Sequence, residues 1–306
     1  MNETALLINT ALASGTTLAL AALGLLINER AGVLNLGAEG MMLVAAVAGF
    51  AAALLTGSDT LGFLAAAAAG AALASVFGLL VIFLNTNQYA TGLALSLFGY
   101  GFSAFVGVAM VGKSLSPREQ VAIPVLSDLP FVGPALFSHH PMVYGAMALT
   151  AAIAWFFYRT RSGLLLRAIG ENPEPAHALG YPVRAIRMAA VCAGGALCGL
   201  AGAYISLVTA PLWVEGLTAG RGWIALALTV FATWRPARAL LGAYLFGGVT
   251  VLQLNLQAQG VQISSHLLTM LPYVATIVVL ALISRNTAFI RLNMPASLGK
   301  PFRPGS

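Results

Sequence analysis

Charged residues are scarce in this sequence of 306 residues, and Lys, Arg, Asp and Glu together account for 8% of it. A soluble domain carries about a quarter. Cysteine is almost absent, with two residues, whereas apolar residues make up 59% of the chain. Apolar runs of about 20 residues, each long enough to cross a bilayer, recur along the whole sequence. We therefore expect an all-α polytopic membrane protein, which excludes most soluble enzyme folds.

The motifs of an intramembrane enzyme are also missing. The sequence contains neither HExxH nor GxSxG, and so shows no metal-binding or nucleophile motif of these kinds. His139 and His140 have only Glu119 and Asp128 as acidic neighbours in the loop 113–141, too few for a metal site. We expect no catalytic residue, no metal and no cofactor in this chain.

One ATP-binding motif matches by letter alone. Gly107–Ser114 fits G-x-x-x-x-G-K-[ST], but a phosphate-binding loop follows a strand and opens a helix. Here the glycines end an apolar run, and Pro117 favours a turn after the motif. We interpret the match as chance and expect ATP to be used only by a partner chain.

Nine apolar segments are candidates for membrane spans: residues 5–28, 38–57, 61–84, 89–112, 142–158, 188–208, 222–234, 239–257 and 266–284. Arginine is frequent in the loop 159–187, the turn 235–238 and the tail 285–306, and nine spans place all three on one side. Because positive charge marks the cytoplasmic side, we expect the C-terminus in the cytoplasm and the N-terminus outside. The whole chain, 1–306, then forms one transmembrane domain.

Two segments predict broken helices, one near 31–40 and one near 211–236. The first contains three glycines and the polar residues Asn35 and Glu39, and the apolar run in the second is short. Irregular backbone at membrane depth is tolerated where protein or a water-filled cavity covers it, so such breaks point to a central pathway.

Four polar residues are candidates for that pathway: Asn35, Glu39, Asn87 and Gln88. A helix over 35–40 would stack Asn35 and Glu39 on one face in the protein interior, because they lie four residues apart. The alternative is a cytoplasmic turn over 31–37, with Glu39 at the N-terminus of the second span, where a carboxylate is favoured.

The loop 159–187 predicts a short capped helix between two spans. Gly170 is expected to break the preceding apolar run, after which Asn172 is an N-cap and Pro173 takes the first helical position. Such a helix suits docking to a soluble partner, and a plain surface helix that shortens the loop is the alternative. Ala176 and Leu179 would supply apolar contact. The expected docking surface comprises Arg167, Gly170, Glu171, Asn172, Pro173, Glu174, Ala176, Leu179, Gly180 and Tyr181.

Small residues share one face of the sixth span: Gly195, Gly199, Gly202 and Ser206. Such a face lets another helix approach closely. Packing within the bundle is the plainer interpretation, and the three glycines are also candidates for pairing with a second subunit.

Three stretches resemble a known family. They are RAIGENPEPAHALGY over 167–181, INERAGVLNLGAEGM over 27–41 and GRGWIALA over 220–227. The chain resembles the permeases in the branched-chain amino acid, ribose and nucleoside group of ABC importers, above all those that work with Bmp-type nucleoside-binding lipoproteins. One departure is Thr233-Trp234-Arg235, where the family pattern has a glycine-containing turn before Pro236.

The resemblance implies a fold like that of type II ABC importers, in a prokaryotic inner membrane. It implies a cytoplasmic ABC ATPase that binds 159–187 as a coupling loop, a binding protein outside and a second, non-identical permease. Nucleosides are the expected substrates, with sugars and branched-chain amino acids as alternatives. A secondary transporter or channel is a different class, and it would require ion-coupling carboxylates within the spans, where Glu39 is the one candidate.

Overall fold

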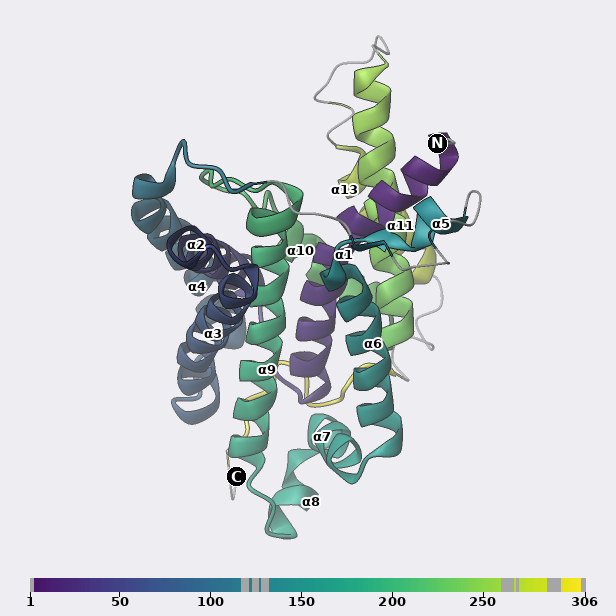
Figure 1. Ribbon diagram of the computed structural model, residues 1–306. Helices are drawn as coiled ribbons and strands as arrows, with labels where there is room; N and C mark the ends of the chain where they lie inside the picture. Colours follow the sequence, from purple (N-terminus) through teal and green to yellow (C-terminus); the bar gives the residue numbers. More distant parts are fainter. Residues whose placement is uncertain are drawn as a thin grey trace.

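The computed structural model consists mainly of long helices, several of which run side by side along the length of the molecule (Figure 1). It describes residues 3–116, 121–122, 127, 132–259, 267, 270–284 and 293–303. Seven of the described helical stretches are long and apolar enough to cross a membrane: Thr4–Arg30, Ala38–Thr56, Asp59–Phe83, Gln88–Met110, Pro141–Arg159, Val183–Thr209 and Pro236–Ala258. The expected all-α membrane fold is therefore confirmed.

The individual elements follow the predicted segments closely. The long helices are α1 (Glu3–Arg30), α2 (Ala38–Thr56), α3 (Asp59–Gly78), α4 (Gln88–Gly107), α6 (Pro141–Arg159), α9 (Val183–Tyr204) and α11 (Pro236–Ala258). The shorter helical elements are η1 (Leu79–Phe83), η2 (Val108–Met110), α5 (Val132–Leu136), α7 (Arg161–Glu171), α8 (Pro173–Ala178), η3 (Ile205–Thr209), α10 (Arg221–Phe231) and α13 (Leu271–Ser284). Strands β1 (Val121–Ala122) and β2 (Ser138–His139) pair antiparallel.

The nine predicted segments each overlap one of these helices, but nine full spans are not confirmed. The seventh segment corresponds to α10, which has only 11 residues. The ninth corresponds to α13, and most of the positions beside that helix lie outside the described residues. Parts of the predicted outer loop 113–141 and of the tail 285–306 also lie outside them.

Three helices form the interior of the bundle. About two thirds or more of the most apolar stretch of α1, α2 and α9 is buried, whereas α4, α6 and α11 bury about a third or less. The outer helices therefore present apolar faces to lipid or to a partner subunit.

The small-residue face of α9 packs inside this chain. A Cβ atom on Gly199 would lie 2.3 Å from a carbonyl oxygen of α3, and one on Gly202 would lie 2.1 Å from a carbonyl oxygen of α2. Gly195 meets α3 with similar closeness, and the Ser206 hydroxyl donates a hydrogen bond to a carbonyl of α2. The interpretation as internal packing is confirmed, and these glycines are not available for pairing with a second subunit.

Both predicted helix breaks are present. The chain leaves helical geometry over 31–37, with Gly32 at φ +83°, and again over 210–220, with Ala219 and Gly220 at φ +48° and +79°. The 11 residues of α10 span about 16 Å, half of the roughly 30 Å hydrocarbon layer. The C-terminal end of α10 leads into the turn beside Arg30, at the end of α1. The N-terminus of α10 therefore lies near the middle of the hydrocarbon layer.

The turn after α10 adopts left-handed backbone without glycine. Thr233 and Trp234 have φ values of +50° and +54°, a geometry that costs of the order of 1–3 kcal/mol per residue. The Trp234 indole N–H donates to the buried carboxylate of Glu29, and the Arg30 guanidinium donates to the Trp234 carbonyl at 3.0 and 3.2 Å. These bonds offset the strain, which explains how the turn forms without the expected glycine.

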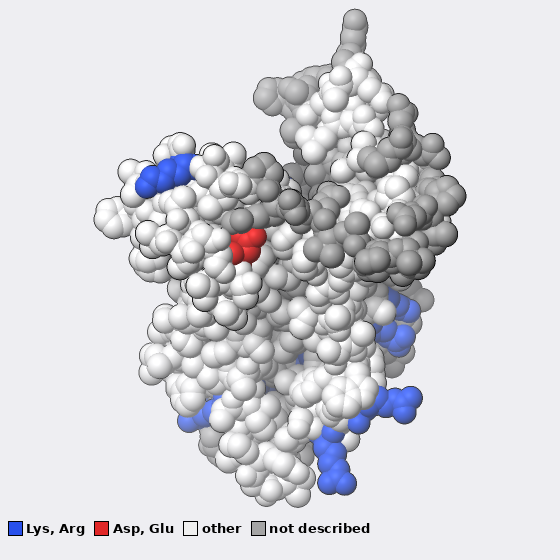
Figure 2. All heavy atoms as spheres, in the orientation of Figure 1, with Lys and Arg blue, Asp and Glu red and all other residues white. Residues whose placement is uncertain are grey.

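Basic side chains gather at one end of the molecule, the lower end in Figure 2. The same end holds α7 and α8 (Figure 1). Arg30, at the end of α1, donates to Trp234 before α11 and to Asn293 in the tail. The three arginine-rich segments thus converge at this end, as predicted from their charge. It is called the inner end below, after the expectation that positive charge marks the cytoplasmic side.

Candidate functional site

The predicted docking helix forms at the inner end. Helix α7 begins after Thr160, whose hydroxyl accepts from the Gly163 N–H at 3.0 Å. Asn172 ends α7 and caps α8, accepting from the Glu174 N–H at 3.1 Å, with Pro173 at the first helical position. The start of α8 was therefore predicted from its capping residues.

Gly170 does not break the preceding helix, contrary to expectation. Helix α7 continues through it to Glu171. A Cβ atom at position 170 would lie 2.1 Å from the carbonyl oxygen of Arg30. The glycine is needed because α7 crosses the end of α1 at close range.

The side chains of α8 and the turn after it face two environments. Leu179 is 78% exposed and Tyr181 is 45% exposed, while Glu174 is also exposed. Ala176 is buried among Ile169 and other apolar residues of a small core. The expected contact of Ala176 with a partner is therefore corrected, because its methyl group packs inward. Leu179 remains available.

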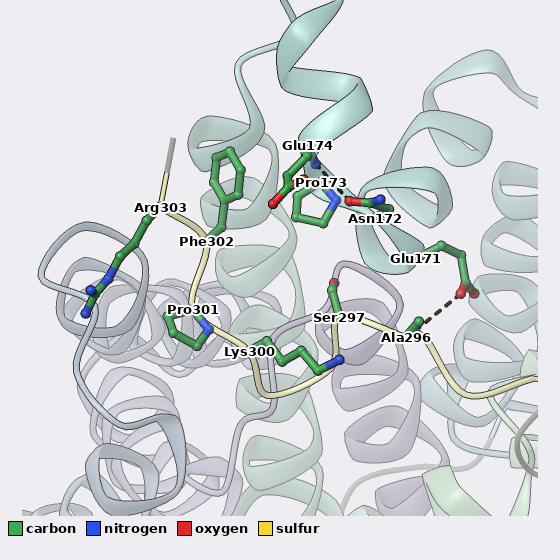
Figure 3. Close-up of a pocket in the computed structure, with 10 residues that line it drawn as sticks. All are labelled: Glu171, Asn172, Pro173, Glu174, Ala296, Ser297, Lys300, Pro301, Phe302 and Arg303. Carbon is green, nitrogen blue, oxygen red and sulfur yellow. Dashed lines mark hydrogen bonds between the residues drawn. The ribbon is translucent and has the colours of Figure 1, made fainter. Parts of the chain in front are cut away.

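The C-terminal tail completes this small core. Phe302 packs with Ile169, Ala176 and Val183, and its ring lies edge-on to the ring of His177 at 5.6 Å. Figure 3 shows the tail running beneath the junction of α7 and α8. This contact could not be predicted from the sequence, because a single phenylalanine among polar residues shows no helical or strand periodicity.

Ser297 holds the tail at the base of the loop. Its N–H donates to the Gly170 carbonyl at 3.0 Å, and its hydroxyl donates to the same carbonyl at 2.7 Å. The hydroxyl also accepts from the Arg187 guanidinium at 2.9 Å. Glu171 accepts from the Ala296 N–H at 3.2 Å (Figure 3). These bonds join α7, α9 and the tail into one unit.

A cavity of about 330 Å³ separates the α7–α8 junction from the tail. Glu171 and Glu174 line one side, and Lys300 and Arg303 line the other (Figure 3). The surface around α8 therefore offers both signs of charge as well as the apolar side chain of Leu179. This is a surface suited to a protein partner.

Replacing Phe302 with alanine is expected to loosen α8 without unfolding the bundle. Loss of this ring should cost about 2 kcal/mol of local stability, below the 3–5 kcal/mol of a deep core position because the tail lies at the surface. Amide hydrogen exchange over residues 172–180 should then accelerate about 30-fold.

Phe302→Leu is the matched control and should retain most of the protection. Exchange in α1 and α9 reports on global stability and should stay unchanged in both variants. Equal protection of α8 in the alanine variant and the wild type would show that the tail does not hold this helix.

A second candidate site lies where the two helix breaks meet. Glu39, in the first turn of α2, accepts from the Thr218 hydroxyl at 2.5 Å, the Gly220 N–H at 2.8 Å and the Gly222 N–H at 2.6 Å. The Tyr100 hydroxyl donates to it at 3.3 Å. Glu39 thus caps α10 with its side chain, placing a carboxylate at the positive end of that helix.

Glycine is required at position 222 for this contact. A Cβ atom there would lie 2.6 Å from the Glu39 Oε2 atom and 2.7 Å from its Cα atom. The close approach of two helix starts therefore depends on a glycine in one and a carboxylate in the other.

The other predicted pathway residues support the first break. Asn35 is buried and its Oδ1 atom accepts from the Gly37 N–H at 2.9 Å, while the buried Gln88 accepts from the Leu34 N–H at 2.8 Å. Helix α2 begins only at Ala38, so the expected stacking of Asn35 and Glu39 on one helical face is wrong. The backbone follows the alternative, a turn over 31–37 with Glu39 in the first turn of the second span. The interior position of both is as predicted.

Asn87 differs from the other three because it is exposed. Its Oδ1 atom accepts from the backbone N–H groups of Tyr89 and Ala90, at 2.9 and 3.1 Å, and so caps α4. None of the four predicted pathway residues lines a described cavity.

A cavity of about 340 Å³, with polar side chains set in a largely apolar lining, lies towards the opposite end, hereafter the outer end, and was not predicted. Its lining comes from α1, the segment before α6, α9 with η3, α10 and α11, and includes Asn9, Ser14, His140, Thr209, Arg221 and Thr250. These residues are spread over most of the sequence, so no local pattern could bring them together. The volume is within the range of small-molecule sites, about 300–1,000 Å³.

His139 also lines this cavity, and its burial disfavours the charged form of the imidazole. Burial lowers the pKa of His139 below its ordinary value, partly opposed by a hydrogen bond to the Ala135 carbonyl at 3.0 Å. The His140 ring accepts from the Met142 N–H at 3.1 Å and caps α6. The two imidazoles thus have structural partners within the chain.

Comparison with known proteins identifies the relatives of this chain. Residues 7–283 match the family described as branched-chain amino acid transport system / permease component. A Haloferax volcanii permease, provisionally named for glucose ABC transport, is 42% identical over 97% of this chain and 97% of its own length.

Two further relatives carry names that refer to nucleosides. A nucleoside ABC transporter permease of Lactococcus lactis is 32% identical over 92% of this chain and 93% of its own. A guanosine ABC transporter permease of Bacillus subtilis is 32% identical over 94% of this chain and 93% of its own length. No solved structure matches the chain significantly.

Proposed function

The chain belongs to the branched-chain amino acid transport system permease family of ABC transporters, and from this premise we propose that it is one half of the translocation pathway of a nucleoside importer. As a permease of this family it works with a partner ATPase and a substrate-binding protein. The ATPase docks on α8 and the turn after it, and the inner end is cytoplasmic. The observation that supports this docking is the exposed Leu179 on a helix fixed by caps and by the tail.

In this proposal the broken-helix site transmits movement and does not bind substrate directly. The polar atoms of Glu39, Asn35 and Gln88 already bond to backbone groups of the two breaks. These bonds hold α2, α4 and α10 in register beside the pathway. Substrate would meet the outer cavity, whose hydroxyl groups and Arg221 guanidinium can bond to the hydroxyl groups of a sugar ring.

A second permease is proposed, and the resemblance of residues 27–41 to the permeases of nucleoside importers favours a non-identical chain. One copy of this permease offers one docking helix, and the described connections at the inner end show no second helix of this kind. The pairing surface then lies on the exposed apolar faces of the outer helices, because the glycine face of α9 is used internally.

A monosaccharide is the second candidate substrate. The relative provisionally named for glucose shares 42% identity with this chain, against 32% for the two named for nucleosides. A nucleoside contains a sugar ring as well, so both candidates present hydroxyl groups to the cavity. The two differ in the base, which adds a flat aromatic surface.

Uptake into vesicles that contain this chain, its ATPase, the second permease and the binding protein should separate these candidates. We expect ATP-driven uptake of guanosine and adenosine, competition among nucleosides, and no competition by glucose or leucine. Each of the four components should be required.

Two outcomes would revise the proposal in different ways. Uptake of glucose that nucleosides do not inhibit would replace the substrate while leaving the transporter class intact. Uptake by this chain alone, driven by an ion gradient, would contradict the ABC mechanism. Vesicles with a second copy of this chain in place of the other permease test the heterodimer.

A further inference from the structure

An arginine-rich cavity of about 630 Å³ lies at the inner end, between the ends of α6 and α7 and the start of α11. Arg30, Arg167, Arg235 and Arg238 line it, and Glu171 is the only acidic residue among its described lining residues. It is distinct from the cavity beneath α8, although Glu171 contributes to both.

The positive charge of this cavity is only partly balanced. The Glu171 carboxylate already accepts a hydrogen bond from the tail. Arg30 donates its hydrogen bonds to the backbone carbonyls of Trp234 and Asn293, and the buried Nε–H of Arg167 has no acceptor among the described residues. Arg238 donates to the Thr233 hydroxyl at 2.9 Å. Four guanidinium groups beside one carboxylate leave an excess of positive charge around the hollow, and an anion bound there would offset their repulsion.

The cavity lies at the level of the membrane surface. Arg30 is the last residue of α1, Tyr158 is next to the last residue of α6, and Pro236 is the first of α11. Tyr158 lines the cavity, and the Arg167 guanidinium lies 5.4 Å from the centre of its ring. Trp155, one turn deeper on the same face of α6, is 64% exposed. Exposed Trp and Tyr side chains at helix ends mark the membrane–water interface.

We propose that this cavity binds the phosphate headgroup of an anionic phospholipid. Guanidinium groups bind phosphate oxygens with paired hydrogen bonds, and basic pockets between membrane helices are suited to such headgroups. The acyl chains would lie along the exposed apolar face of α6 that carries Trp155. Free phosphate shares the headgroup chemistry but would gain nothing from that face.

The bound lipid would join three segments that meet at the inner end. Its phosphate would link the end of α1 to α7, which leads into α8, and to the start of α11. An anionic lipid would therefore stabilise the base of the docking surface. This effect on coupling rests on the proposed function, whereas binding of the lipid does not.

The binding test uses the permease purified with its ATPase in mixed phosphatidylglycerol and phosphatidylcholine, with retained lipid measured by native mass spectrometry. The wild type should retain phosphatidylglycerol in preference to phosphatidylcholine. Arg235→Gln combined with Arg238→Gln should lower that retention at least about tenfold, because two of the four positive charges are lost. Arg235→Lys with Arg238→Lys keeps the charge, and should retain an intermediate amount.

Arg161→Gln with Arg184→Gln is the matched control, since it removes the same charge at the inner end from residues that do not line the cavity. It should retain lipid like the wild type. Equal loss in both pairs would show a general basic surface and overturn the site, as would equal retention in both.

Two measurements on the unmodified protein keep the proposal testable if the variants misfold. Phosphatidylglycerol should be retained in the presence of excess inorganic phosphate, and displacement by phosphate would indicate a site for the free ion instead. If bound ATPase shields the cavity from solvent in the absence of anionic lipid, the cavity binds a protein partner, and the lipid proposal is contradicted.

Discussion

Replacing Leu179 with aspartate is expected to abolish coupling to the ATPase while the permease still folds and inserts. Leu179 is 78% exposed at the inner end, so the substitution disturbs no internal packing. An apolar side chain at the centre of a protein interface contributes 2 kcal/mol or more when it is an anchor residue. Burying a carboxylate in its place adds an unpaired charge. Association with the ATPase should weaken by at least about 30-fold.

The measurement is recovery of the ATPase with the purified permease, together with ATP hydrolysis stimulated by loaded binding protein. Leu55→Asp is the matched control, because Leu55 is 86% exposed near the end of α2 that points away from the docking surface. Stimulation of ATP hydrolysis that persists in Leu179→Asp but is lost in Leu55→Asp would show that the ATPase docks at the other end of the molecule, and would contradict docking at Leu179.

Replacing Glu39 with alanine is expected to be the most damaging change in the membrane interior. It removes the acceptor of two backbone N–H groups and of the Thr218 hydroxyl. Each buried donor left unpaired costs about 1–3 kcal/mol, and α10 loses the carboxylate at its N-terminus. The thermal midpoint of the complex in detergent should fall sharply, and transport should fall at least tenfold in material that remains folded.

Two comparisons make the result specific. Glu215→Ala removes an exposed carboxylate from the same irregular segment and should change neither quantity. Glu39→Gln keeps the shape but replaces one acceptor oxygen with a donor, so it should give an intermediate loss. Unchanged thermal stability and transport in Glu39→Ala would show that the two helix breaks are held by other contacts.

Local signals in the sequence were sufficient for features that depend on neighbouring residues. Asn172 and Pro173 predicted where α8 begins, because an N-cap and a first-turn proline act on the adjacent backbone. Apolar runs and arginine-rich loops predicted the helices and their convergence at one end, because burial in lipid and interfacial charge are properties of single segments.

Features that depend on distant segments could not be predicted in this way. The direction in which Ala176 points is set by Phe302 in the tail, and the role of Gly170 is set by the carbonyl of Arg30. Glu39 was expected in the interior, but nothing near it in the sequence shows that its partners are Thr218, Gly220 and Gly222.

The turn at Thr233 and Trp234 is another feature that the local sequence could not predict. The sequence there lacks the glycine that a left-handed turn favours, so local rules argue against the observed backbone. The compensating bonds come from Glu29 and Arg30 at the end of α1. A residue that breaks a local preference is explained only when its tertiary partners are known.

Photo-crosslinking from α8 to the ATPase tests the central claim most directly. A photoreactive amino acid would be placed at Leu179, and in separate variants at Leu55 and at the buried Ala176, in the complex of permeases and ATPase. The account predicts a crosslink to the ATPase from position 179 and none from position 55 or 176. An intact complex that crosslinks from position 55, or that gives no crosslink from position 179, would contradict the assignment of α8 as the coupling helix.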